Sequence, residues 1–199
     1  MAVAIGNLGS TLTHRNVAVR ATAAWLVSYR WMPEGAVGFS LASQLPLESL
    51  KQQASLTVGI FAWNLAVGGT ALFVSSFFRL GRVPLAYFAP WAWFALYGLA
   101  LGTNSFAITT PGMRIPPQLE IAWNHVGIRE LSAYLLAAAA LADRHLWLQR
   151  NMWDWRLLRV RSWNELRLSR PEIGLLAAAI ALLAWSAATE ASQIVAILR

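Results

Sequence analysis

The chain has 199 residues, of which 57% are hydrophobic and 13% are charged, and its mean hydropathy is +0.48. This composition is too apolar and too poor in charge for an ordinary soluble domain. The absence of cysteine excludes disulfides, thiolate metal sites and cysteine nucleophiles. The formal charge of +7 comes almost wholly from arginine, because Lys51 is the only lysine. Arginines that flank apolar runs favour anionic lipids and carboxylates over nucleic acid as partners.

These properties predict an all-α fold, a polytopic membrane helix bundle with about four transmembrane helices and additional interfacial amphipathic helices. The N-terminal segment, residues 1–53, contains no apolar run long enough to span a bilayer. Its longest run, residues 17–32, is interrupted by Arg20 and Arg30. We therefore expect this run to form a helix that lies in the membrane interface.

Residues 54–142 are predicted to form a core of three spans. The first span, residues 55–78, has no charged residue and carries Asn64 near its centre. The second span begins at Val83 or Pro84 and continues to about Gly102. The third begins near Ile128, and its purely apolar part ends near residue 142. A bilayer needs about 20 residues of helix, so this third span must share the membrane with polar groups.

Residues 143–170 are predicted to form an amphipathic arm rich in arginine and tryptophan, lying at the level of the lipid headgroups. A helical arrangement would place its apolar side chains on one side and its arginines on the other. The residues expected to face lipid or a partner are Arg150, Trp153, Arg156, Arg159 and Trp163.

The last predicted span, within residues 171–199, is interrupted only by Glu190. Its alanine-rich face suits close helix packing; this face comprises Ala177, Ala178, Ala181, Ala184 and Ala188. The excess of arginine near the arm places the arm in the cytoplasm by the positive-inside rule, in a multi-pass protein of the cell membrane.

The candidate intramembrane polar site consists of Asn64, His125, Arg129, Glu130 and Glu190. His125 and Arg129 are four residues apart and therefore share one face of a helix. Ionisable groups inside a membrane bundle commonly mark a proton or ion pathway. All of these charged residues except Glu190 lie near a predicted membrane edge, so we favour a structural ion pair, in which Glu130 or Glu190 pairs with an arginine. The chain has no phosphate-binding glycine loop, no HExxH and no GxSxG, so we expect no catalytic residue and no enzyme. Its three histidines are too scattered to indicate a metal site.

Three segments, FAWNLAVGGTALF, WFALYGLALGTNSFA and NHVGIRELSAYLLAAAALA, resemble the membrane core of the stage II sporulation protein M family. The resemblance covers about residues 61–142. It implies a multi-pass bacterial scaffold, because the namesake of the family holds peptidoglycan-remodelling partners at the membrane. The matching positions are Asn64, Tyr97, Gly98, Gly102, His125, Gly127 and Glu130.

We therefore predict a non-catalytic multi-pass scaffold, or a structural subunit of a larger membrane assembly. One alternative is a small oligomeric transporter or channel that uses the intramembrane glutamates and histidine. Another is an accessory subunit of a photosynthetic or respiratory complex, with tryptophans that contact a pigment or quinone. We expect other membrane subunits and anionic lipids as partners, bound lipid, and no nucleic acid. A homo-oligomer is compatible with the sequence because four spans enclose little space.

Overall fold

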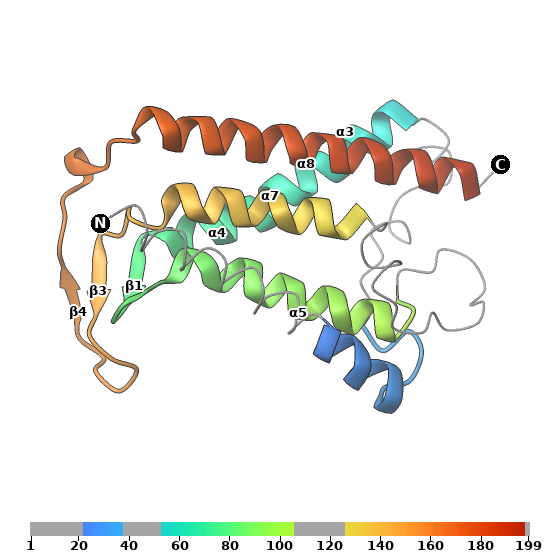
Figure 1. Ribbon diagram of the computed structural model, residues 1–199, viewed down its shortest axis with the longest axis horizontal. Coiled ribbons are helices and arrows are strands. Elements are labelled where there is room, and N and C mark those ends of the chain that lie inside the picture. The colour runs from blue at the N-terminus through green and yellow to red at the C-terminus, as the bar shows by residue number, and fades with distance from the viewer. Residues whose placement is uncertain (1–21, 38–52, 106–125, 198–199) are drawn as a thin grey trace, which may run out of the picture. The chain divides into compact units, whose positions relative to one another are not determined.

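The computed structural model describes residues 22–37, 53–105 and 126–197. The chain divides into two compact units. The first comprises Met1–Leu45 and Trp91–Trp123, and the second comprises Pro46–Pro90 and Asn124–Arg199. The described residues are mainly helical (Figure 1). Three helical segments are long and apolar enough to cross a membrane: Gln53–Ser76, Leu85–Gly102 and Arg170–Ala196. Three of the four predicted spans therefore exist as helices of sufficient length and hydropathy.

In the first unit, a helix over residues 22–31 packs against α5 (Phe88–Gly102), most of which belongs to this unit. The Ser28 hydroxyl lies 3.3 Å from the carbonyl oxygen of Gly98. A Cβ on Gly102 would lie 2.6 Å from the Trp25 carbonyl oxygen. The two backbones therefore approach closely because small residues stand at the contact. The interfacial helix predicted for residues 17–32 is thus helical in its described part.

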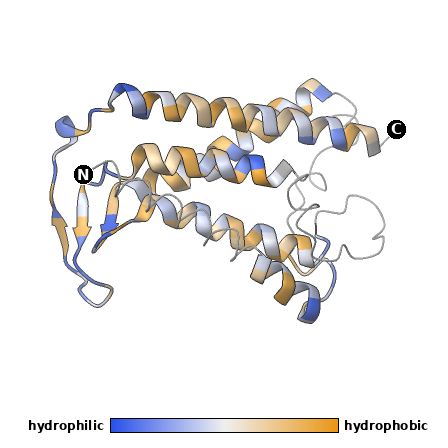
Figure 2. Cartoon of the chain, viewed as in Figure 1, coloured by the Kyte–Doolittle hydropathy of each residue, from blue (hydrophilic) through white to orange (hydrophobic). Residues whose placement is uncertain are grey.

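The second unit begins with α3 (Gln53–Asn64), continues through a π-helical turn at Leu65–Gly69 and ends in α4 (Thr70–Ser76). α7 (Val126–Leu141) packs along α8 (Arg170–Ile197), and α8 also contacts α3. Most of the buried side chains of these helices are apolar, and so are many of the exposed ones; Figure 2 shows hydrophobic residues along the length of the helices. Val58, Phe73 and Trp185 are each more than half exposed. Such outward apolar faces are typical of helices surrounded by lipid.

The packed face of α8 is not the face predicted from its alanines. The buried stripe repeats every four residues and contains Ala179, Leu183, Ala187 and Ala191. The predicted alanines at 177, 178, 181 and 184 are exposed. Alanine occurs on both sides of this helix, so composition could not distinguish the packed side from the outer one.

A four-stranded sheet lies at one end of the second unit, in the order β2-β1-β3-β4. The central strands β1 (Phe78–Leu80) and β3 (Trp147–Gln149) are parallel, and β2 (Val83–Pro84) and β4 (Leu157–Arg159) are antiparallel to them. The β1–β2 pair connects α4 to α5, and the β3–β4 pair connects α7 to α8. The predicted purely helical fold is therefore wrong in this part.

The amphipathic helix predicted for residues 143–170 is also wrong, because this segment forms β3, β4 and a short 3-10 turn at Trp163–Glu165. Two side chains stabilise the turn between β3 and β4. Asn151 Oδ1 accepts hydrogen bonds from the backbone N–H groups of Trp153 and Asp154, and Asp154 Oδ1 accepts one from the N–H of Arg156. Such side-chain turns compete directly with a helix. The strand β1 then supplies the edge on which β3 pairs.

The turn between β1 and β2 depends on Gly81, whose φ is +55°. Its N–H donates to the carbonyl oxygen of Gln149 at 2.7 Å, and a Cβ at this position would lie 3.2 Å from the carbonyl oxygen of Arg150. Glycine adopts this left-handed conformation without steric cost. Gly81 therefore joins the first strand pair to the second.

Candidate functional site

The candidate site lies where the beginning of α7 faces the end of α8. Arg129 Nη1 is 3.4 Å from the hydroxyl oxygen of Thr189, and its guanidinium carbon lies 4.8 Å from the centre of the Trp185 ring. Glu130 lies beside this contact, close enough to Glu190 on α8 for the two carboxylates to repel each other. The structure therefore brings together three of the predicted site residues, Arg129, Glu130 and Glu190.

Tyr134 connects this cluster to the α3–α4 segment. It lies one helical turn after Glu130, within hydrogen-bonding reach of the Glu130 carboxyl group, and its hydroxyl donates to the carbonyl oxygen of Asn64 at 2.9 Å. Asn64 is the last residue before the π-helical turn, where the regular backbone hydrogen bonding changes. The Asn64 backbone, rather than its side chain, thus makes the described contact with α7.

The ring of Tyr134 lies against Gly68. A Cβ on Gly68 would be 2.7 Å from Tyr134 Cε1 and nearer still to the hydroxyl end of the ring. Only a glycine leaves room for the ring at this place. Tyr134 was not among the residues predicted for the site. The available signal was the one aromatic side chain of α7, because a buried phenol hydroxyl needs a hydrogen-bond partner.

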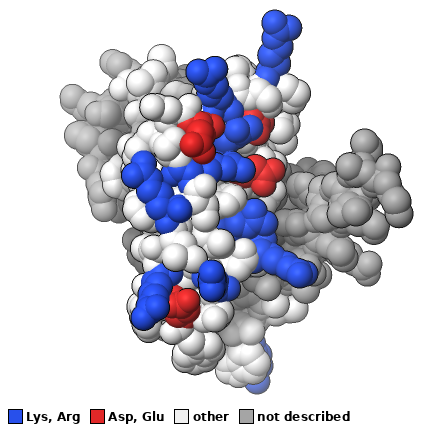
Figure 3. Space-filling model, turned by 90° about the vertical axis from the view of Figure 1, so that its left-hand side faces the viewer, with Lys and Arg blue, Asp and Glu red and all other residues white. Residues whose placement is uncertain are grey.

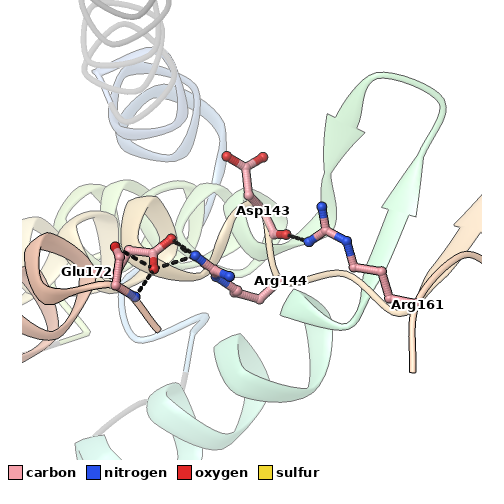
Figure 4. A network of polar contacts seen from close by, with 5 residues as sticks. Asp143, Arg144, Arg161 and Glu172 are labelled. Atoms are coloured by element: carbon pink, nitrogen blue, oxygen red, sulfur yellow. Dashed lines mark hydrogen bonds and ion pairs between the residues drawn. The ribbon is translucent and has the colours of Figure 1, made fainter. Parts of the chain in front are cut away.

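A second group of polar contacts lies at the opposite end of the α7–α8 pair (Figure 4). The Arg144 guanidinium binds both carboxylate oxygens of Glu172. Glu172 Oε2 also accepts a hydrogen bond of 2.6 Å from the Ser169 N–H, which caps the first turn of α8. In the same region Arg161 donates to the backbone carbonyl of Asp143.

The two groups are separated by nearly the thickness of a bilayer core. Glu172 and Thr189 are 17 residues apart on one helix, which corresponds to about 25 Å at helical rise, whereas a hydrocarbon core is about 30 Å thick. Tyr134 lies between them along α7. The Arg129–Glu130–Glu190 cluster is therefore far from the sheet, and the Arg144–Glu172 pair is next to it.

The sheet end carries the five predicted arm residues, all of which are exposed: Arg150, Trp153, Arg156, Arg159 and Trp163. Trp163 also has a structural contact, because its ring meets the Phe77 ring edge-on with a centroid distance of 5.0 Å. It therefore fastens the 3-10 turn to the end of α4.

His145 lies at the base of this sheet and is 9% exposed. Its Nδ1 atom is buried without a hydrogen-bond partner. Burial lowers the pKa of His145, the nearby guanidinium groups of Arg79 and Arg161 lower it further, and the Asp143 carboxylate opposes them. The neutral imidazole is therefore the form that fits this environment.

His125 lies outside the described residues, so its predicted position beside Arg129 stays a prediction. Among residues 22–37, 53–105 and 126–197, no three histidine or acidic side chains gather in a way that could hold a metal ion. The described polar residues can pair charges, share protons and bind headgroup phosphates.

Comparison with known proteins gives no relative for this chain. No protein-family model matches it, and no curated protein or solved structure matches it either.

Proposed function

We propose that the chain is a multi-pass protein of the cell membrane that acts as a non-catalytic scaffold, or as a structural subunit of a larger assembly. α7 would be the fourth span, in addition to the three helical segments of sufficient length. Its 16 residues correspond to about 24 Å, which falls short of the core thickness. The remaining thickness would be spanned by the residues that flank its apolar part. Their polar groups, Arg129 and Glu130 at the beginning and the Arg144–Glu172 pair beyond the end, would lie at the two membrane interfaces.

The observation that carries this proposal is that α7 contacts its neighbouring helices at three levels along its length. Arg129 contacts Thr189 of α8 at one end, Tyr134 contacts Asn64 and Gly68 in the middle, and Arg144 pairs with Glu172 at the other end. A framework held at several levels resists relative helix movement, which suits a scaffold better than a carrier that must change shape. The helix faces that remain apolar and exposed would contact lipid or partner subunits.

We also propose that the chain belongs to the stage II sporulation protein M family. Two positions that carry the resemblance, Asn64 and Glu130, lie on either side of Tyr134. The arginine-rich sheet end would face the cytoplasm by the positive-inside rule.

The test is purification of the protein from its native membrane in mild detergent, with an absorption spectrum and identification of the co-purifying chains. The scaffold proposal expects partner subunits in fixed stoichiometry. Gly68→Leu, which would displace the Tyr134 ring, should release these partners, whereas Gly59→Leu should retain them because nothing lies within 4 Å of a Cβ at Gly59. A protein that purifies without partners would contradict the proposal. Bound pigment or quinone would favour the accessory-subunit alternative.

The second candidate function is a small oligomeric transporter. The closeness of Glu130 and Glu190 favours it, because paired carboxylates inside a membrane bundle can bind a proton or cation. In proteoliposomes this alternative expects a proton or sodium flux that Glu130→Gln and Glu190→Gln abolish. Glu165→Gln, on the exposed 3-10 turn at the sheet end, is the matched control and should keep the flux. Absence of flux in the wild-type protein would exclude this candidate.

A further inference from the structure

The turn between β3 and β4 presents large apolar side chains to the outside. Met152 is 71% exposed, and Trp153 and Trp155 are each 90% exposed. The side-chain turns of Asn151 and Asp154 hold the loop in this shape. A loop tip with two tryptophans and a methionine is unfavourable in water, but it suits the boundary between headgroups and acyl chains.

The surface around this tip is strongly basic. Figure 3 shows arginine side chains gathered on the face that carries the sheet, with fewer acidic side chains between them. The arginines of the two strand pairs and their connections are Arg79, Arg82, Arg144, Arg150, Arg156, Arg159, Arg161, Arg167 and Arg170, and the acidic residues of the same segments are Asp143, Asp154 and Glu165. This balance complements an anionic surface.

The orientation of the β3–β4 hairpin places its apolar tip and its arginines at the same level along the helix axes. β3 and β4 run across the ends of α7 and α8 and do not extend along the helix axes (Figure 1). They lie at the same end of α8 as the Arg144–Glu172 pair. If α8 crosses the bilayer, the hairpin therefore lies along the membrane surface, with its tip at the level of the headgroups.

We propose that the β3–β4 hairpin is a docking surface for anionic phospholipids of the membrane in which the helices stand. Arg150, Arg156 and Arg159 bind headgroup phosphates, and Trp153 and Trp155 insert at the acyl boundary. The inference rests on the proposed membrane placement and deepens it, because it names a lipid class and the residues that recognise it. An acidic protein partner is the competing occupant. The exposed arginine side chains would suit such a partner, but the apolar tip favours lipid.

The test exploits the absence of cysteine from the chain. Trp153→Cys is labelled with the polarity-sensitive fluorophore NBD and placed in nanodiscs of phosphatidylcholine, with or without phosphatidylglycerol. We expect a blue-shifted emission that doxyl-labelled lipid quenches, and stronger quenching when phosphatidylglycerol is present. Inorganic pyrophosphate added to phosphatidylcholine discs should not reproduce this effect, which separates lipid from free phosphate.

The contribution of charge is measured as the amount of phosphatidylglycerol retained by the protein during purification from mixed lipid. Replacement of Arg150, Arg156 and Arg159 by glutamine should reduce its preference for this lipid by roughly fivefold per arginine. Replacement of the same three arginines by lysine keeps the positive charge and is the matched control, so it should leave most of the preference in place. High salt should weaken the preference.

Two results would overturn the inference. One is a label at position 153 that stays in water in both kinds of nanodisc, and the other is an arginine variant that retains as much phosphatidylglycerol as the wild type. Alkaline carbonate extraction of the membranes from which the protein is purified distinguishes these failures from failure of the membrane placement itself. Protein that resists extraction but shows a water-exposed label refutes only lipid docking, and protein that is extracted refutes the placement.

Discussion

The Tyr134 hydroxyl donates a hydrogen bond of 2.9 Å to the Asn64 carbonyl oxygen, across the contact between α7 and the π-helical turn that joins α3 to α4. The same ring occupies the space left by the missing side chain of Gly68. One residue of α7 thus both satisfies a backbone acceptor and fills a packing gap in its neighbour.

Tyr134→Phe should keep the packing and lose only the hydrogen bond. Interhelical hydrogen bonds in membrane proteins contribute about 0.6 kcal/mol on average, so a small decrease in stability is expected. Gly68→Ala should cost more, because its Cβ must displace the ring. Thermal unfolding in detergent measures both effects. Gly59→Ala, where a Cβ meets nothing within 4 Å, is the control and should not destabilise the protein.

The double variant Gly68→Ala/Tyr134→Ala tests whether the two residues act through one contact. Removal of the ring makes room for the new methyl group, so the combined loss should be clearly smaller than the sum of the two single losses. The unfolding midpoints of the four proteins provide this comparison. Additive losses would show that Gly68 and Tyr134 do not share a contact.

Glu172 should stabilise the start of α8 in two ways, as a partner of Arg144 and as the cap of the Ser169 N–H. Glu172→Ala should therefore lower the free energy of unfolding by about 1 kcal/mol or more. Arg144→Gln should cost less, because it leaves the cap in place. Glu165→Ala on the neighbouring 3-10 turn is the matched control. Unfolding at low and high salt separates the contributions, since salt screens the ion pair more than the cap. Equal losses from the two substitutions would contradict the capping role.

Because the pKa of His145 is lowered, we expect the folded protein to lose stability in acid. Its pKa is lower in the folded protein than in the unfolded chain, so the unfolded chain takes up the proton first. The stability present at neutral pH should therefore decrease as the pH falls below about 6.5, and it should continue to decrease until the folded-state pKa is reached. His145→Gln should remove this part of the pH dependence. Unfolding midpoints measured from pH 8 to pH 5 provide the test. An unchanged acid response in His145→Gln would refute the role of this residue.

The sequence predicted the three long apolar helices well, because hydropathy over a span-length window depends on composition and little on tertiary contacts. It failed for residues 143–170, where a helix with an apolar side and an arginine side was expected but two strands and their turn form. The deciding factors were the turns made by Asn151 and Asp154 and the edge offered by β1, which is far away in the sequence. Non-local pairing of this kind leaves no local periodic signal.

The candidate site was predictable in part. Arg129, Glu130 and Glu190 were identified because charge inside apolar runs is uncommon. The role of Tyr134 depended on the neighbouring π-helical turn, which the sequence did not indicate. The cap formed by Ser169 and Glu172 was predictable from the sequence, because Ser-x-x-Glu before an apolar run is the pattern of a capping box.

The most direct test of the central claim, that α8 crosses the membrane with the sheet on one side, is the accessibility of single cysteines. Asn164→Cys lies at the sheet end before α8, and Gln193→Cys lies near the other end of this helix, and both positions are exposed. In sealed vesicles a membrane-impermeant maleimide should label them from opposite sides, with Asn164→Cys reacting on the cytoplasmic side. Labelling of both positions from the same side would contradict the account.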